Sequence, residues 1–128
     1  MITKQQKIQH WLDGSMKDKK TALDMYKLKH YDWCLFLWHL SLEKIIKANI
    51  IKNNKEIIFI HNLIKLAQNT NIELSDEEIK SLATINSFNL NTRYDDYKYS
   101  FYKQCSPSFT HKWVIICKKI YLKFKNNL

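Results

Sequence analysis

The chain contains a single glycine, Gly14, and a single proline, Pro107, in 128 residues. Glycine and proline supply the sharp turns that link short strands, so their scarcity argues against an all-β fold. It also excludes a glycine-rich phosphate-binding loop of the Rossmann or Walker type. Any contact with phosphate must therefore come from side chains or from helix N-termini.

Five segments carry apolar residues at the three- and four-residue intervals of a helix. They cover residues 3–27, 31–52, 61–70, 75–90 and 107–125. Ser75 and Glu78 have the spacing of a capping box, and Pro107 suits a first helical turn. The segment 31–52 is apolar nearly all round, so we expect it at the centre of the structure. The sequence predicts a single helical domain over residues 1–128, an all-α, antiparallel up-and-down bundle of about five helices.

Lysine dominates the charge of the chain. The formal net charge is +9, and Arg93 is the single arginine among 21 basic residues. A charge of this size favours polyanionic partners such as RNA, a nucleotide or an acidic protein, unless the lysines only solvate helix faces. A guanidinium binds a carboxylate or a phosphate through two parallel hydrogen bonds. Arg93 is therefore a candidate for a structural ion pair or for contact with an anion.

The three cysteines, Cys34, Cys105 and Cys117, show neither a Cys-x-x-Cys motif nor Cys/His metal-ligand spacing. Cys34 and Cys117 lie in apolar stretches, so we expect both to be buried. Neither a metal nor another cofactor is expected. The N-terminus is polar and the apolar stretch 31–51 is interrupted by charges, so we predict neither a secretory signal nor a membrane span. These features favour the reducing cytoplasm.

A polar row crosses the apolar central segment at His39, Glu43 and Lys47. Residues four apart lie along one stripe of a helix. A polar stripe on such a helix must face water or meet polar partners. One interpretation is a Glu43–Lys47 ion pair beside a hydrogen-bonded His39. The other is a polar site shared with Arg93 and the two carboxylates that follow it.

Aromatic residues crowd the segment 88–102, where they alternate with Arg93 and Lys98. Such rings can stack on nucleic-acid bases. They can equally pack against the bundle or against a second subunit, where tyrosine is common. The residues alone leave both interpretations open.

The order of the polar motifs resembles the HEPN domain, a family of nucleotide-binding domains of higher eukaryotes and prokaryotes. The matching motifs, within about residues 8–103, are His39-x-x-x-Glu43-Lys-x-x-Lys47-Ala, His61-x-Leu63 and Arg93-Tyr94-x-Asp96. The resemblance implies an all-α bundle that forms a homodimer through the helices carrying these motifs. It also implies pairing with a small nucleotidyltransferase, often as toxin and antitoxin, and binding of a nucleotide or RNA.

By position, the resemblance implies that six residues line the family's polar cleft: His39, Glu43, Lys47, Arg93, Tyr94 and Asp96. Many HEPN proteins are metal-independent ribonucleases with a histidine about four to six residues beyond the arginine, as general acid or base. In this sequence that window holds no histidine, and the next one is His111. The standard ribonuclease centre is therefore absent, no catalytic residue is assigned, and enzymatic activity stays an open question.

Three functions fit these observations. The first is a non-enzymatic nucleotide- or RNA-binding module that works with a nucleotidyltransferase. The second is a ribonuclease toxin with a non-standard centre that uses Arg93 with His39 or His61. The third is an assembly scaffold in which the polar stripe only orients the dimer. The missing arginine-to-histidine spacing favours the first.

Overall fold

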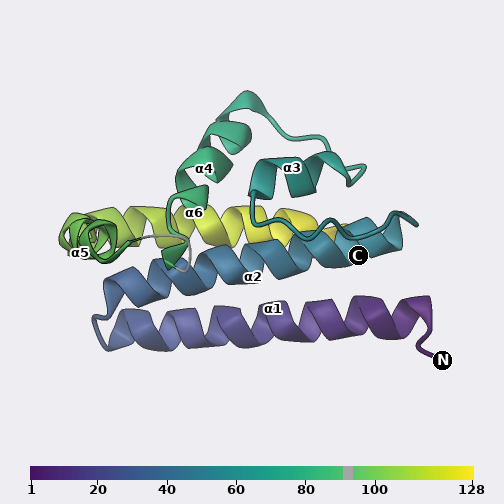
Figure 1. The fold of residues 1–128 in the computed structure, drawn as a ribbon, viewed down its shortest axis with the longest axis horizontal. Coiled ribbons are helices and arrows are strands. Elements are labelled where there is room, and N and C mark those ends of the chain that lie inside the picture. Colours follow the sequence, from purple (N-terminus) through teal and green to yellow (C-terminus); the bar gives the residue numbers. More distant parts are fainter. Residues whose placement is uncertain (91–93) are drawn as a thin grey trace.

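A computed structural model describes residues 1–90 and 94–128, and within these ranges it contains helices and no strand. Three long helices form the body of the molecule, and three shorter ones cover one side and one end (Figure 1). The helices are α1 (Lys4–Lys27), α2 (Tyr31–Lys52), α3 (Leu63–Gln68), α4 (Asp76–Asn86), α5 (Asp95–Gln104) and α6 (Pro107–Asn126). The all-α prediction is confirmed, with one helix more than the five expected.

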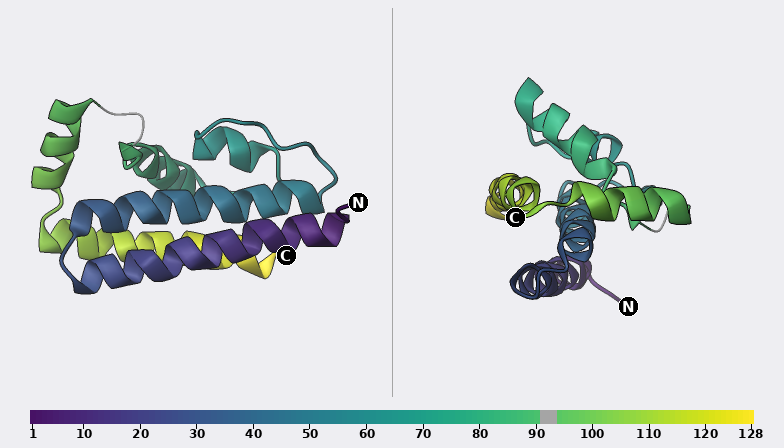
Figure 2. Two further views of the ribbon diagram at one scale, coloured as in Figure 1. Left: turned by 60° about the horizontal axis from the view of Figure 1, so that its bottom comes forward. Right: turned by 90° about the vertical axis from the view of Figure 1, so that its left-hand side faces the viewer.

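The core is built around α2, in which 14 of the 22 residues are buried. The end-on view of Figure 2 shows α1 and α6 on different sides of α2, with α4 over a third. Trp38 of α2 is fully buried and meets the ring of Tyr121 of α6 edge-on, with centroids 6.3 Å apart. Asn49 Nδ2 donates to the carbonyl oxygens of Ile45 and Phe124, each at 3.0 Å, and so ties α2 to α6. The central position expected for this segment is confirmed.

A tight antiparallel hairpin joins α1 to α2. Thr3 begins α1 with a capping box, and Lys29, at φ 64°, occupies the left-handed position just past the end of α1. Gly14 makes room for the Lys44 side chain of α2, because a Cβ at this position would sit 3.2 Å from Cδ of Lys44. The Lys44 side chain crosses at this point and donates to Asp18 on α1 at 2.6 Å.

The shorter helices begin where their capping residues lie rather than where the apolar pattern of the sequence begins. The Asn62 side chain accepts from the first backbone amides of α3, so this helix begins at Leu63 instead of at residue 61. The capping box at Ser75 is present as expected. Helix α5 was not among the predicted elements, since Phe101 is its single buried residue and leaves no apolar stripe to read. A helix can thus form in a segment whose sequence shows no hydrophobic periodicity.

All three cysteines are buried free thiols, which confirms the expectation for Cys34 and Cys117. Burial raises the pKa of Cys34 and of Cys105 to about 12, and that of Cys117 is raised as well. These side chains therefore act as small apolar groups and not as nucleophiles. None of the described helices is both long enough and apolar enough to cross a membrane.

Candidate functional site

The polar row of α2 is buried inside the molecule. His39 is fully buried, and Glu43 and Lys47 are each only 6% exposed. Lys47 Nζ lies 3.0 Å from Glu43 Oε2, which is the ion pair expected from their spacing. On its other side the same ammonium stands over the ring of Trp11 of α1, 5.1 Å from its centroid. A charged pair at this depth needs further partners to offset its lost hydration.

The second oxygen of Glu43 meets a histidine from outside the helix. His61 Nδ1 lies 2.9 Å from Glu43 Oε1, and the His61 side chain is 62% exposed. An ionised carboxylate can only accept, so Nδ1 carries the proton and donates it to Glu43. The ring is thereby oriented with Nε2 as its free nitrogen. Glu43 joins a buried cation to a histidine at the surface.

His39 holds the backbone of His61 in place. His39 Nε2 lies 3.2 Å from the carbonyl oxygen of His61 and donates to it, since a carbonyl can only accept. Burial lowers the pKa of His39, although the nearby Glu43 acts in the opposite direction. Its Nδ1 is buried and has no hydrogen-bond partner within residues 1–90 and 94–128. His39 is thus a neutral anchor beneath the surface histidine rather than a surface group itself.

Three asparagines surround His61 at the start of α3. Asn86 Oδ1 accepts from the amide of Leu63 at 2.8 Å, and Asn86 Nδ2 donates to Asn62 Oδ1 at 3.2 Å. A shallow pocket of about 190 Å³ is lined by His61, Asn62, Asn86 and Asn89. The pocket offers amide donors and acceptors beside the ring nitrogen of His61. Such a mixture suits a phosphate or a base edge.

The start of α5 carries the other predicted site residues. Tyr94 is 80% exposed and precedes the first turn of α5. Asp96 is exposed as well, and its Oδ1 accepts from the backbone amide of Tyr97 at 2.9 Å. Neither side chain forms a hydrogen bond or an ion pair with the polar row of α2 in the described part of the chain. Arg93 lies outside the described residues.

Residues 8–127 match the family model of the HEPN domain, which is nearly the whole chain. This chain belongs to the HEPN domain family. The crystal structure of the protein TT1696 from Thermus thermophilus is similar to it with a TM-score of 0.81 and 14% sequence identity, over 94% of this chain and 98% of that one. At this identity the likeness supports the fold alone. None of the curated proteins matches the sequence significantly.

The HEPN motifs are therefore only partly in contact. The structure joins His39, Glu43 and Lys47. It adds His61, which the sequence marked through the His-x-Leu motif and as an alternative ribonuclease residue, but which was not among the six residues expected to line the cleft. No spacing rule could pair His61 with Glu43, because a loop separates the two residues in sequence. In the described part of the HEPN chain, no group of three or more His, Cys, Asp or Glu side chains could hold a metal ion.

Proposed function

We propose that this HEPN chain is a nucleotide- or RNA-binding module whose anion site is built around His61. The observation that carries the proposal is the buried Glu43 carboxylate, which holds Lys47 on one oxygen and His61 on the other. Because Nδ1 is bound to Glu43, Nε2 is the ring nitrogen left for a ligand, and an Nε2–H there can donate to a phosphate oxygen. Charge-assisted hydrogen bonds of this kind are among the stronger ones available to a protein.

The remaining predicted residues complete the proposed cleft. Arg93 would hold a phosphate through two parallel hydrogen bonds. The exposed ring of Tyr94 offers a surface on which a base can stack. The free oxygen of Asp96 can accept from a ribose hydroxyl. The net charge of +9 draws a polyanion toward any such site.

We further propose that the chain is a homodimer that acts with a small nucleotidyltransferase as a toxin–antitoxin pair in the cytoplasm. The support for the dimer is α5, whose tyrosines lie on the surface and not in the core. The tyrosines that are more than half exposed are Tyr97, Tyr99 and Tyr102 within α5 and Tyr94 at its N-cap. Tyrosine is enriched at protein interfaces. The nucleotidyltransferase partner follows from the HEPN resemblance.

A second function, RNA cleavage, draws on the same histidine. A carboxylate that orients one imidazole nitrogen and leaves the other free is the arrangement of a general acid or base. His61 and Glu43 have this arrangement. The chain lacks the arginine-to-histidine spacing of ribonuclease members of the family, so we rank binding ahead of cleavage. Loss of RNA cleavage in both Arg93→Ala and His61→Ala would favour this second function.

The binding proposal is tested by thermal unfolding with ATP or with a short oligouridylate at low salt. Ligand at about a hundredfold excess over its Kd stabilises the native state by about 2.7 kcal/mol. We expect either ligand to raise the Tm of the wild type. The ligand should raise the Tm of the control variant His10→Ala as well, which removes a different exposed histidine, on α1. His61→Ala should lose most of the shift. No shift with either ligand would contradict the proposal and support the scaffold.

A further inference from the structure

A second feature of the surface is an open groove between α1 and α6, away from His61. Both helices pack on α2, and they meet each other through hydrogen bonds between Ser15 and Tyr121, at 3.0 Å, and between Tyr26 and His111, at 3.1 Å. Beside the Tyr121 contact lies a pocket of about 510 Å³. It lies between the middle of α1 and the C-terminal half of α6.

The rim of this groove carries a concentrated positive charge. Lys17, Lys19 and Lys20 of α1 and Lys125 of α6 line it, and no Asp or Glu does so among the described residues. None of these four ammonium groups has a salt bridge in the described ranges. Burial, followed by the charges of Lys125 and Lys118, lowers the pKa of Lys19. The groove is therefore a place where added negative charge would be favourable.

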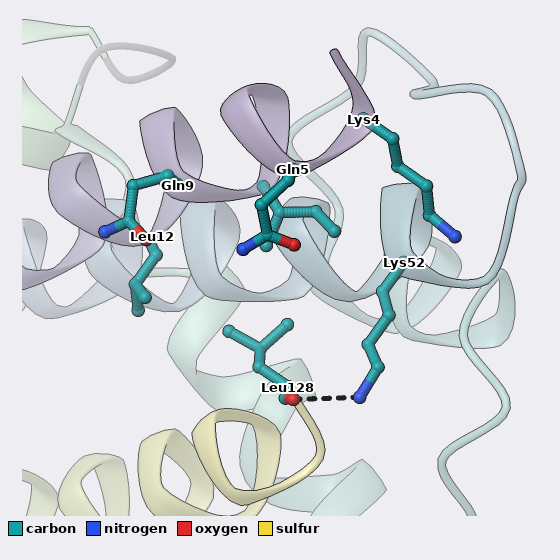
Figure 3. Close-up of a pocket in the computed structure, with 7 residues that line it drawn as sticks. Lys4, Gln5, Gln9, Leu12, Lys52 and Leu128 are labelled. Carbon is teal, nitrogen blue, oxygen red and sulfur yellow. Dashed lines mark hydrogen bonds between the residues drawn. The ribbon is translucent and has the colours of Figure 1, made fainter.

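The floor of the groove is apolar. Met16 and Leu23 contribute their side chains, and Tyr121 lies beneath them. On α1, Leu12 precedes Met16 by four residues and Leu23 follows it by seven, so the three side chains share one side of the helix. Figure 3 shows Leu12 and Leu128 pointing into the adjoining pocket at the other end of the groove. From Leu12 to Leu23 these apolar side chains span about 16 Å, or three helical turns, with Lys19 and Lys20 between Met16 and Leu23.

In the adjoining pocket, by contrast, one lysine already donates its hydrogen bonds to backbone oxygens. Lys52 Nζ donates to the backbone oxygen of Asn127 at 2.8 Å. It also donates to the backbone oxygen of Leu128 at 2.9 Å (Figure 3). The rim lysines beside Met16 have no such acceptors within the part of the chain that the structure describes. What distinguishes the α1–α6 groove is that four such lysines line one apolar floor.

We propose that the α1–α6 groove binds an acidic amphipathic helix of a partner protein. The apolar side chains of that helix would cover Met16 and Leu23, and its carboxylates would pair with the rim lysines. This is the helix-in-groove mode, in which apolar residues at helical spacing anchor one face of the ligand. Such a site is separate from the His61 cleft and neither requires nor excludes nucleotide binding there.

Nucleic acid fits the same groove less well. A phosphate backbone would pair with the lysines but would leave the apolar floor without a partner. Base stacking needs an accessible ring, whereas Tyr121 is fully buried and Lys19 Nζ stands over it, 4.8 Å from the centroid. Among the described residues that line the groove there is also no arginine, the side chain suited to bidentate phosphate contact. Both the floor and the rim therefore favour a protein partner.

The test uses the full chain and a fluorescently labelled synthetic peptide of about four helical turns, with leucine at the a and d positions and glutamate elsewhere. Fluorescence anisotropy gives its affinity, and a scrambled peptide of equal composition controls for charge alone. The groove variant is Lys20→Glu with Lys125→Glu. The matched control is Lys55→Glu with Lys80→Glu, which makes the same change in net charge at exposed positions elsewhere.

We expect saturable binding of the amphipathic peptide, at least about tenfold weaker binding of the scrambled peptide, and a loss of about tenfold or more in the groove variant. The control variant should bind within about threefold of the wild type. Met16→Glu should weaken peptide binding as the rim changes do, because it places a like charge on the floor. All variants should retain the ATP-induced change in Tm, which depends on the His61 cleft.

Three outcomes would overturn this proposal. The first is no binding of the amphipathic peptide to the wild type. The second is equal affinity for the two peptides, which would show that the floor is not recognised. The third is binding of an oligouridylate of equal charge that weakens in the groove variant and not in the control, which would make the groove a nucleic-acid surface.

Discussion

At the scale of single residues, the site depends on a carboxylate that is almost inaccessible to water. The Glu43 side chain is 8% exposed, and its two oxygens are occupied by Lys47 and His61. Removing one partner of a buried ion pair leaves an uncompensated charge, whose cost exceeds the net contribution of the intact pair. Glu43 thus supports the fold and orients the surface histidine at the same time.

Replacement of Glu43 by glutamine should therefore lower the free energy of unfolding by about 3 kcal/mol, because the Lys47 ammonium stays buried without its carboxylate. Urea denaturation measures the change. Asp95→Asn is the matched control, since the Lys98–Asp95 pair is long, at 3.9 Å, and its carboxylate is fully exposed. A Glu43→Gln variant as stable as this control would show that the buried pair does not stabilise the fold.

At the scale of helices, boundaries are set by caps. Helix α1 ends in a Schellman motif: Lys29 N–H donates to the carbonyl of Tyr26, and His30 N–H donates to that of Met25. The end of α2 repeats this pattern around Asn54. Both Lys29 and Asn54 have positive φ, at 64° and 61°. Lysine is poorly suited to this conformation, whereas asparagine tolerates it.

Lys29→Gly should accordingly raise the free energy of unfolding by about 0.5–1 kcal/mol, because glycine removes the left-handed strain. Asn54→Gly provides the comparison and should give a smaller gain. Thermal denaturation of the two variants beside the wild type measures both. If Lys29→Gly were destabilising, the left-handed turn after α1 would not be a source of strain.

The sequence predicts the long helices well and the short ones poorly, for physical reasons. The limits expected for α2 agree with the structure because its apolar pattern is continuous. Helix α5 could not be predicted because Phe101 is its one buried residue, and a single apolar position creates no periodic pattern in the sequence. The contact between His61 and Glu43 depends on how the loop after α2 folds back, and local patterns do not encode that path.

At the scale of the whole molecule, the polar surfaces divide between two sides of the bundle. The loop before α3 carries His61 and α5 carries exposed tyrosines, whereas the α1–α6 groove carries the rim lysines. We assign the first side to nucleotide binding and dimerisation and the second to a protein partner. This division predicts that changes on one side leave binding on the other unaltered.

The proposed dimer gives a prediction at this scale. Tyr97→Asp with Tyr102→Asp places charges at two exposed positions of α5 and should convert the dimer to a monomer, since buried unpaired charges oppose association. Sedimentation velocity measures the change. Met16→Asp, on the opposite side, should leave the dimer intact. A wild-type chain that sediments as a monomer at high concentration would refute the assignment.

The most direct test of the nucleotide site is the NMR signal of the His61 ring nitrogens during titration with ATP at low salt. We predict that the Nε2 resonance of His61 shifts progressively and saturably. The ring of His10, exposed on α1, should stay unchanged. A His61 resonance that is unaffected at saturating ATP, or that shifts only as much as that of His10, would contradict nucleotide binding at His61.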